Sequence, residues 1–387
     1  MAHCDLCEVA LDESRVMSAN FEFELATPQT EGQFRQLLSD NALSGNINML
    51  LTREPNAFHA AAISGDVYEL MLGYRQAPKQ LVGCGARFEL DAFINGNVER
   101  IGYLGELRFQ GGFKQRRTLL LEAYRAMRRC HEAGNTPFYI TTIIADNTST
   151  RRLLEAGLSD MPTYQPLETI VTLTIPARQA AGLSAPRIRV EQNSAIRMEG
   201  IAKRLNDTGR NYQFHPVWNT ETLVSAERCR GISSSDFFVV RDESGIRGAL
   251  CLWDQRAFKQ SVVAGYSPRL ARARPFFNFV APMLRKPRLP PPGHPLESAF
   301  LSHLSVDPDD EATLLALIRE AAGHAVRRGI DYVMLGLAER NTLCKALQRR
   351  ISCHRYVSMI YLVYWQDGRE DAGRIDDRIP HPEIAIL

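Results

Sequence analysis

The stretch that decides the fold is Leu107-Arg108-Phe109-Gln110-Gly111-Gly112-Phe113-Lys114-Gln115-Arg116-Arg117-Thr118, which joins an apolar strand to a long amphipathic helix. Three cations, Lys114, Arg116 and Arg117, stand where that helix begins. A helix N-terminus carries roughly half a positive charge, so each cation there is unfavourable by about 0.3–1 kcal/mol. An anion held by the backbone N–H groups of the loop would offset this repulsion. The stretch therefore predicts either an anion site or a solvated basic turn.

Strand and helix signals alternate on both sides of this loop. An Asn-Gly turn within residues 95–97 is a strong hairpin signal, and it places a strand directly before the loop. Apolar residues at helical spacing follow the loop and end at Gly134, which indicates a long helix. The same criteria predict strands over residues 21–26, 67–74, 80–90, 98–109, 138–144 and 164–175, and helices over residues 30–40, 118–133 and 148–156.

A segment with several Pro, Gly, Ala and Ser residues divides the chain. It spans residues 177–190 and is the predicted linker between a domain of residues 1–176 and a domain of residues 191–387. The second domain is expected to contain a hairpin over residues 237–240 and 246–253, strands over residues 298–306, 330–337 and 356–365, and helices over residues 311–328 and 342–350.

The two domains repeat one pattern. Phe109 precedes Asn147 by 38 residues, and Val306 precedes Asn341 by 35 residues. In both intervals the order is strand, loop, helix, Gly, strand, Asn, helix. This is a twofold repeat of whole domains rather than a solenoid of short units.

This order of elements resembles the GNAT superfamily of N-acetyltransferases, and the duplication resembles its tandem members. Leu107 and Phe109 match the hydrophobic pair at the end of the family's fourth strand. Phe113 matches the aromatic residue of the loop that follows, and Lys114 matches its basic position. The resemblance implies an α/β (α+β) fold of two tandem GNAT-like domains, each a mixed, mostly antiparallel, twisted sheet flanked by helices.

The resemblance also implies a co-substrate, acetyl-CoA or another acyl-CoA. In the family the amides of this loop bind the pyrophosphate, and the fourth strand pairs with the pantetheine arm. A backbone N–H near the bulge of that strand is the oxyanion donor. Carried over to this chain, the cofactor-binding residues are Leu107, Arg108, Phe109, Lys114, Gln115, Arg116, Arg117, Thr118 and Asn147.

The corresponding loop of the second domain has the opposite charge. The run Asp309-Asp310-Glu311 stands where its long helix begins. Acidic side chains stabilise a helix N-terminus without any ligand, and they would repel a pyrophosphate. We therefore expect the second domain to have lost cofactor binding.

Two residues are candidates for acid–base catalysis. Acyl transfer to an amine needs a base for the amine and a proton for the leaving thiolate. Glu106 is the candidate base, and its alternative role is a salt bridge with Arg108 or with a neighbouring strand. Leu154 stands where many GNAT members carry a tyrosine as general acid. Tyr164 is therefore the candidate acid, and its alternative role is packing.

The overall composition excludes several classes of protein. With 45% hydrophobic and 23% charged residues the chain is a globular protein. Its formal net charge of +2 at pH 7 gives no reason to expect nucleic acid or a membrane as a partner. No apolar run approaches ~18 residues, and the first residues lack the regions of a signal peptide, so we expect a cytoplasmic protein.

The eight cysteines are scattered, with one close pair, Cys4 and Cys7. A zinc site would need further ligands at similar spacing, and no second pair exists, so we expect free thiols and no bound metal. The other six cysteines lie among apolar residues and are expected to pack in the core.

These features together predict an acyl-CoA-dependent N-acyltransferase, in its simplest form an N-acetyltransferase, that acts by direct attack of a primary amine on the thioester. The acceptor stays open between a small molecule and a peptide. The alternative is a non-catalytic protein that keeps the fold to bind a ligand or a partner. The run of residues 283–295 is predicted to be an exposed loop or a lid over the site.

Overall fold

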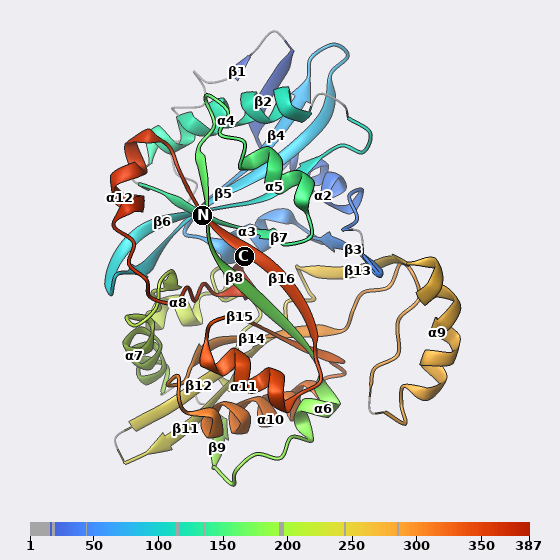
Figure 1. The fold of residues 1–387 in the computed structure, drawn as a ribbon, viewed down its shortest axis with the longest axis vertical. Helices are drawn as coiled ribbons and strands as arrows, with labels where there is room; N and C mark the ends of the chain where they lie inside the picture. Colours follow the sequence, from blue (N-terminus) through green and yellow to red (C-terminus); the bar gives the residue numbers. More distant parts are fainter. Residues whose placement is uncertain are drawn as a thin grey trace.

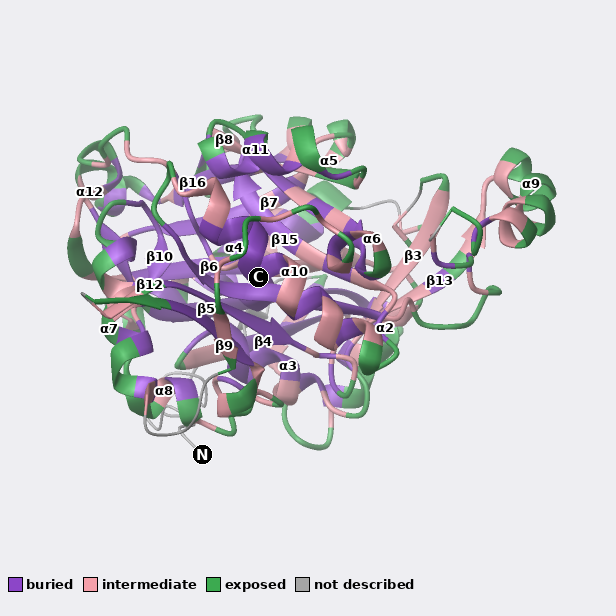
Figure 2. Ribbon diagram, turned by 90° about the horizontal axis from the view of Figure 1, so that it is seen from below, coloured by how far each residue is buried: buried purple, intermediate pink, exposed green. Residues whose placement is uncertain are grey.

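The structure is a computed structural model that describes residues 16–17, 20–43, 45–113, 116–134, 136–192, 197–243, 245–284 and 286–387. Its centre is one large twisted sheet, and helices pack on both faces of this sheet (Figure 1). Buried residues concentrate in the sheet and on the inner sides of the helices, as Figure 2 shows. The sheet therefore forms the scaffold on which the loops of any site are held.

The first half of the chain alternates strands and helices. Its strands are β1 (Val16–Met17), β2 (Phe21–Leu25), β3 (Ile47–Thr52), β4 (Val67–Arg75), β5 (Gln80–Ile94), β6 (Asn97–Phe109), β7 (Tyr139–Ile144) and β8 (Thr163–Pro176). Its helices are α2 (Glu31–Ser39), α3 (Ala57–Ser64), α4 (Arg116–Ala133), α5 (Thr148–Leu154) and α6 (Ala177–Ala181). Asn95 and Gly96 join β5 to β6 with φ values of 52° and 84°, the conformation that a tight hairpin turn requires.

The second half repeats the alternation. Its strands are β9 (Val190–Gln192), β10 (His215–Pro216), β11 (Phe237–Asp242), β12 (Gly245–Trp253), β13 (Gln260–Tyr266), β14 (Ser298–Ser305), β15 (Tyr332–Ala338) and β16 (His354–Tyr364). Its α-helices are α7 (Met198–Gly209), α8 (Thr220–Val224), α9 (Pro268–Val280), α10 (Glu311–Arg327), α11 (Thr342–Arg350) and α12 (Arg369–Gly373). Three short 3₁₀ turns in the described residues are η2 (Ser234–Asp236), η3 (Gln366–Gly368) and η4 (Ile384–Ile386).

The predicted repeat is present in the structure. Both β6–α4–β7–α5 and β14–α10–β15–α11 place a long helix between two parallel strands and a short helix after them. Asn147 caps α5 by accepting from the N–H of Thr150, and Asn341 caps α11 by accepting from the N–H of Leu343. The two predicted asparagines therefore have the same local role.

The two halves exchange one strand each. Along the sheet, β6 and β7 of the first half are followed by β16 of the second half, then by β8 of the first half, and then by β15 and β14. β16 pairs antiparallel with β7, β8 pairs antiparallel with β15, and the exchanged strands pair with each other. Figure 1 shows β8 and β16 side by side in the middle of the molecule. The halves thus share one continuous sheet, and the division into domains of residues 1–176 and 191–387 stays a prediction.

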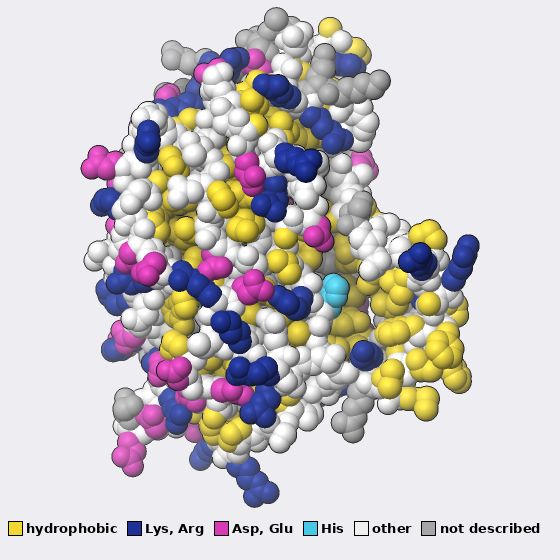
Figure 3. All heavy atoms as spheres, in the orientation of Figure 1, with side chains coloured by type: hydrophobic (Ala, Val, Ile, Leu, Met, Phe, Trp, Pro, Cys, Tyr) yellow, Lys and Arg dark blue, Asp and Glu magenta, His cyan; other side chains and the backbone are white. Residues whose placement is uncertain are grey.

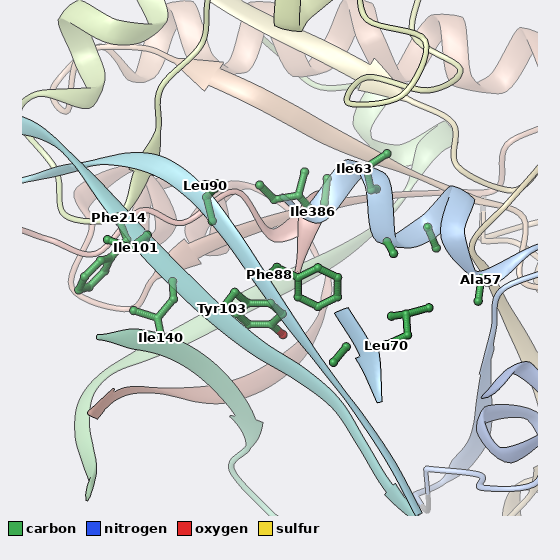
Figure 4. Packing of buried hydrophobic residues seen from close by; sticks show 14 of the residues in the cluster. Ala57, Ile63, Leu70, Phe88, Leu90, Ile101, Tyr103, Ile140, Phe214 and Ile386 are labelled. Atoms are coloured by element: carbon green, nitrogen blue, oxygen red, sulfur yellow. The ribbon is translucent and has the colours of Figure 1, made fainter. Parts of the chain in front are cut away.

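One core cluster contains residues of both halves. It joins Phe88 and Tyr103 of the first half to Trp253 and Ile386 of the second. Figure 4 shows Ile386 close to Ile63 and Phe88 within this cluster. The turn η4 is therefore packed against the strands that lead to the basic loop.

The sequence missed several elements. β3 and β13 pair with each other across more than 200 residues of sequence, a contact that no local pattern indicates. α9 has no buried residue, so it lacks the periodic apolar face by which helices are predicted. The predicted linker begins with α6, whose Ala177 and Ala180 are buried in the core of the second half.

Among the described residues, none of the helices combines the length and the apolar composition that a membrane span requires. Cys4 and Cys7 lie outside the described residues. The predicted core role is confirmed for the buried cysteines, which are Cys84, Cys130, Cys229, Cys251 and Cys344, whereas Cys353 is half-buried.

Candidate functional site

The strand β6 carries a bulge directly before the basic loop. Cys84 faces Arg108 and Ala86 faces Gly105, so β6 has one more residue than β5 in this interval. Glu106 lies in the bulge with a φ of +53°, which is uncommon for a residue other than glycine. A bulge turns backbone groups out of the ladder, so this point of the strand can offer an amide to a ligand.

The neighbouring strand β7 parts from β6 at the same level. The two strands pair in parallel at Gly102↔Tyr139 and Tyr103↔Ile140. A Cβ on Gly102 would lie 2.0 Å from Cδ1 of Tyr139, so the strands approach closely there. Past this point the hydroxyl of Thr141 donates to the carbonyl of Leu104 at 2.6 Å, in place of a continued ladder. The bulged end of β6 therefore lies where the two strands separate.

The N-terminus of α4 is basic and exposed. Arg116 and Arg117 are its first two residues, and its first turn holds no acidic residue. The Nε of Arg116 donates to the carbonyl of Phe113 at 3.1 Å, and its guanidinium lies 5.8 Å from the ring centroid of Phe109. Within the described ranges no carboxylate pairs with either arginine. Thr118 is exposed beside them. The predicted residues Lys114 and Gln115 lie outside the described residues.

In the second half, acidic side chains occupy the N-terminus of the corresponding helix, α10. Asp310 caps the helix by accepting from the N–H of Thr313 at 3.0 Å, and Arg247 donates to Asp310 at 2.7 Å. Glu311 adds a second acid in the first turn. The predicted contrast between the two helix starts is therefore present in the structure.

In the second half, a side chain also occupies the backbone amide of the bulge. His303 lies in β14 with a φ of +50°, where Ala249 faces Ser305 and Cys251 faces Ser302. Its backbone N–H donates to Oε2 of Glu383 at 2.7 Å. In the described part of β6, no side chain accepts from the N–H of Glu106 or Leu107.

Glu106 is ion-paired. Arg53, which follows β3, donates from Nε to Oε1 of Glu106 at 3.0 Å and also from Nη2. Burial opposes the ionisation of Glu106, but Arg53 and Arg108 favour it more strongly, so the pKa of the carboxyl lies below its usual value. The sequence left a salt bridge with Arg108 or with a neighbouring strand as the alternative; Glu106 is indeed ion-paired, but its partner is Arg53, which follows β3 in a separate sheet and was not predicted.

A lysine completes the group around the bulge. The Nζ of Lys259 donates to the backbone oxygens of Ala385 and Leu387 at 3.1 and 3.2 Å. Burial and the nearby Arg53 lower the pKa of Lys259 to about 7, although Glu106 acts in the opposite direction. A lysine with this pKa is partly neutral at physiological pH and can accept a proton.

Comparison with known proteins gives a fold and no family match. No family model matches the chain, and no curated protein matches it. Saccharomyces cerevisiae N-myristoyltransferase with bound myristoyl-CoA superposes with a TM-score of 0.59 at 11% identity, over 90% of this chain and 83% of that chain. A GCN5-related N-acetyltransferase from Sphaerobacter thermophilus superposes with a TM-score of 0.51 at 12% identity, over 88% of this chain and 95% of that one. The chain has the GNAT fold.

The resemblance predicted from the sequence is thus confirmed for the fold, and the predicted α/β (α+β) class is confirmed with it. In this GNAT fold the end of β6, the basic loop and the start of α4 are continuous, so the structure brings most of the predicted cofactor residues together. Leu107 and Phe109 pack against the core beneath α4, and Arg108 donates from Nη1 to the carbonyl of Leu107 at 2.9 Å. Asn147 does not belong to this segment and caps the start of α5.

Tyr164, on β8 of the GNAT fold, is buried in an aromatic cluster. Its hydroxyl is hydrogen-bonded to that of Tyr124 on α4, and its ring lies 6.0 Å from that of Tyr361. Burial and the neighbouring Tyr124 raise the pKa of Tyr164 well above its usual value. Leu154 is also buried. This arrangement matches the packing role, and catalysis by Tyr164 stays a prediction.

Three charged residues at the two bulges were missed by sequence reasoning. Arg53 and Lys259 lie near the bulge of the first half and Glu383 lies at that of the second, and none belongs to a motif. A lone charged residue usually lies at the surface, so its type alone gives no signal. The exposed helix start was detectable because its charges are contiguous in the sequence.

Proposed function

We propose that this chain is an acyl-CoA-dependent N-acyltransferase that binds its acyl donor in the first half and transfers the acyl group directly to a primary amine. One observation carries the proposal. Both halves have a bulged strand and a long helix, yet in the second half acidic side chains occupy both positions, Asp310 at the helix and Glu383 at the bulge amide. The first half has Arg116 and Arg117 at the helix instead.

The basic loop suits the diphosphate of a coenzyme A. Arg116, Arg117 and Thr118 lie exposed at the start of α4, and a guanidinium and a phosphate form strong charge-assisted hydrogen bonds. We assign Lys114 and Gln115 to the same anion from their place in the sequence. The segment 107–109 would pair with the pantetheine arm, and Asn147 would contact the donor from α5.

The bulge suits the thioester. An N–H aimed at the carbonyl oxygen stabilises the negative charge that develops when the amine attacks, and one such donor is worth about 3–4 kcal/mol. The amine attacks the carbonyl carbon and loses one proton to a base, the C–S bond breaks, and coenzyme A leaves as a thiolate that takes up one proton from the solvent.

Two side chains near the bulge can accept the proton of the amine. Glu106, the base predicted from the sequence, is held as a carboxylate by Arg53, which makes it a weak base. Lys259 has a pKa of about 7, close to the value at which a general base works best. We therefore assign the role of general base to Lys259. We assign to Glu106 the role of attracting the cationic amine.

The proposal also has to specify which acyl group is transferred and which amine accepts it. The two solved structures named above are an acetyltransferase and a myristoyltransferase, so the fold accommodates both short and long acyl groups. We propose acetyl-CoA as the first donor to test, with longer acyl-CoA species beside it. The acceptor is a small-molecule or peptide amine.

Calorimetric titration with CoA tests the first step of the proposal. We expect saturable binding by the whole chain, and absence of binding at a millimolar concentration would overturn the proposal. Release of free thiol from acetyl-CoA and longer acyl-CoA species, with a panel of small amines and peptides, then tests turnover.

A second function is favoured by one observation. Leu154 replaces the usual tyrosine acid and is buried, and the hydroxyl of Tyr164 is already engaged by Tyr124. These features suit a protein that binds an acyl-CoA without turnover. Tight binding of CoA with no release of thiol for any amine would support this alternative.

A further inference from the structure

An arm projects from the body of the molecule. It comprises residues 267–290, which form α9 and the return segment after it, and it stands on the two-stranded sheet of β13 and β3. Figures 1 and 2 show α9 far from the central sheet, and none of its residues is buried. The run of residues 283–295, predicted to be an exposed loop or a lid, belongs partly to this arm.

Hydrogen bonds within the arm fix its conformation, although the arm is exposed. The Nδ2 of Asn278 donates to the carbonyl of Leu289 at 3.0 Å, and the N–H of Leu289 donates back to Oδ1 of Asn278 at 2.7 Å. Tyr266 donates to the carbonyl of Pro290 at 2.5 Å, and Arg274 donates to the carbonyl of Leu289 at 3.1 Å. These bonds hold the helix and the return segment together, so the arm presents its surface in a fixed shape.

That surface is apolar at its tip. Phe276 is 73% exposed, Phe279 is 77% exposed and Met283 is 81% exposed, and Leu284 beside them is 56% exposed. Phe276 and Phe279 are three residues apart in α9 and so lie on one side of the helix, and Met283 and Leu284 follow in the turn after its end. Figure 3 shows a yellow patch on this arm. Large apolar side chains gathered in this way mark a contact surface rather than random exposure.

The arm is also strongly basic. Between residues 267 and 290 the sequence has six cations and no Asp or Glu: Arg269, Arg272, Arg274, Arg285, Lys286 and Arg288. Arg269, Arg272 and Arg288 are exposed, and within the described ranges no carboxylate pairs with them. The net charge of +2 for the whole chain conceals this local excess. Two copies of the arm brought face to face would repel each other, so the charge argues against self-association at this surface.

We propose that the α9 arm docks on the surface of a bilayer that contains anionic phospholipids. Phe276, Phe279 and Met283 would enter the headgroup region, and Arg269, Arg272 and Arg288 would bind the lipid phosphates. Helices with exposed aromatic residues and clustered cations have this mode of binding, which scales with the apolar area and with the negative surface charge. The proposal is independent of acyl transfer, because it uses no residue assigned to the acyl-CoA site.

Co-sedimentation of the full chain with extruded vesicles tests the proposal. We expect the protein to pellet with vesicles of phosphatidylcholine and phosphatidylserine, to remain in solution with phosphatidylcholine alone, and to be released by salt. Phe276→Ser with Phe279→Ser, and separately Arg269→Glu with Arg272→Glu, should each weaken partitioning by about tenfold or more. Exposed positions tolerate such changes without unfolding, and a thermal melt verifies this for each variant.

A matched pair of variants controls for the loss of exposed apolar side chains. Val98 and Val224 are 50% and 62% exposed and lie outside the arm. Val98→Ser with Val224→Ser should leave vesicle binding unchanged. The proposal is overturned if the wild-type chain ignores anionic vesicles, or if the arm variants bind them as well as the wild type does. It is also overturned if the arm variants dissociate a dimer of the wild type in sedimentation velocity, because the patch would then be covered by a second copy.

Discussion

Glu106 and His303 occupy equivalent places in the two halves of the molecule, each at a bulge in the strand before a long helix, with φ values of +53° and +50°. A positive φ at a residue other than glycine persists only where the surroundings enforce it. Its recurrence at both bulges shows that the repeat extends to backbone detail. The difference lies in the partners, because Glu383 accepts from the amide of His303, whereas Arg53 pairs with the side chain of Glu106.

Reversing the charge at the start of α4 should weaken CoA binding. Arg116→Glu with Arg117→Glu places two anions at the proposed diphosphate site, and we expect the Kd for CoA to rise by more than about tenfold, which is ~1.4 kcal/mol. Arg129→Glu is the matched control, because this exposed residue lies on the same helix near its other end. Calorimetry measures all three proteins, and equal losses in both variants would point to a general field effect rather than to a site.

Glu383 should make stability depend on pH. Burial raises the pKa of Glu383 to about 7, even though the N–H groups of Ala385 and His303 lower it. Because folding raises the pKa of Glu383, its protonated carboxyl stabilises the folded state fully at a pH below the pKa of the unfolded chain, near 4.5. This stabilisation is lost as the pH rises through 7, where the buried group must ionise. The free energy of unfolding of the wild type, relative to Glu383→Gln, should therefore fall by about 3 kcal/mol between pH 4.5 and pH 8. Urea unfolding at several pH values measures this difference, and parallel pH profiles for the two proteins would contradict it.

The contact between β6 and β7 should tolerate no side chain at Gly102. A Cβ there would meet the ring of Tyr139 at 2.0 Å, and relief requires that the strands separate. We expect Gly102→Ala to lower the free energy of unfolding by about 1–3 kcal/mol. Gly85→Ala on β5 is the control, since a Cβ at that position has no neighbour within 4 Å. Urea denaturation compares the two variants, and equal stability would show that Tyr139 can move aside without strain.

The repeat and the basic helix start could be predicted because their signals are local. Gly134 ends one long helix, and Asp309-Asp310-Glu311 begins the other, so each signal lies within a few residues of the feature that it marks. The exchange of β8 and β16 could not be predicted in this way. A strand's sequence shows that it is buried but does not show which strand lies beside it.

The same limit applies to the candidate site. Arg53 lies 53 residues from Glu106 in the sequence, and Glu383 lies 80 residues from His303. Glu106 was found because it adjoins the motif, and its partner was missed because Arg53 directly follows β3, a strand that pairs with β13 and not with β6. Tyr164 was chosen for its hydroxyl, but its burial beside Tyr124 depends on the packing of α4 over the exchanged strands.

The last prediction separates the two candidate bases and depends on the proposed acyl transfer. If Lys259 accepts the proton of the amine, kcat/KM should rise with pH through about 7, because the neutral amine form of the lysine is the active one. Lys259→Met should remove this inflection and lower kcat/KM by about 10²–10⁴-fold. Glu106→Gln should keep an inflection but move it to lower pH, because the carboxylate, already ionised through its pairing with Arg53, no longer raises the pKa of Lys259. The pH–rate profiles of the three proteins decide the assignment: an inflection that persists in Lys259→Met and vanishes in Glu106→Gln would return the role of base to the carboxylate.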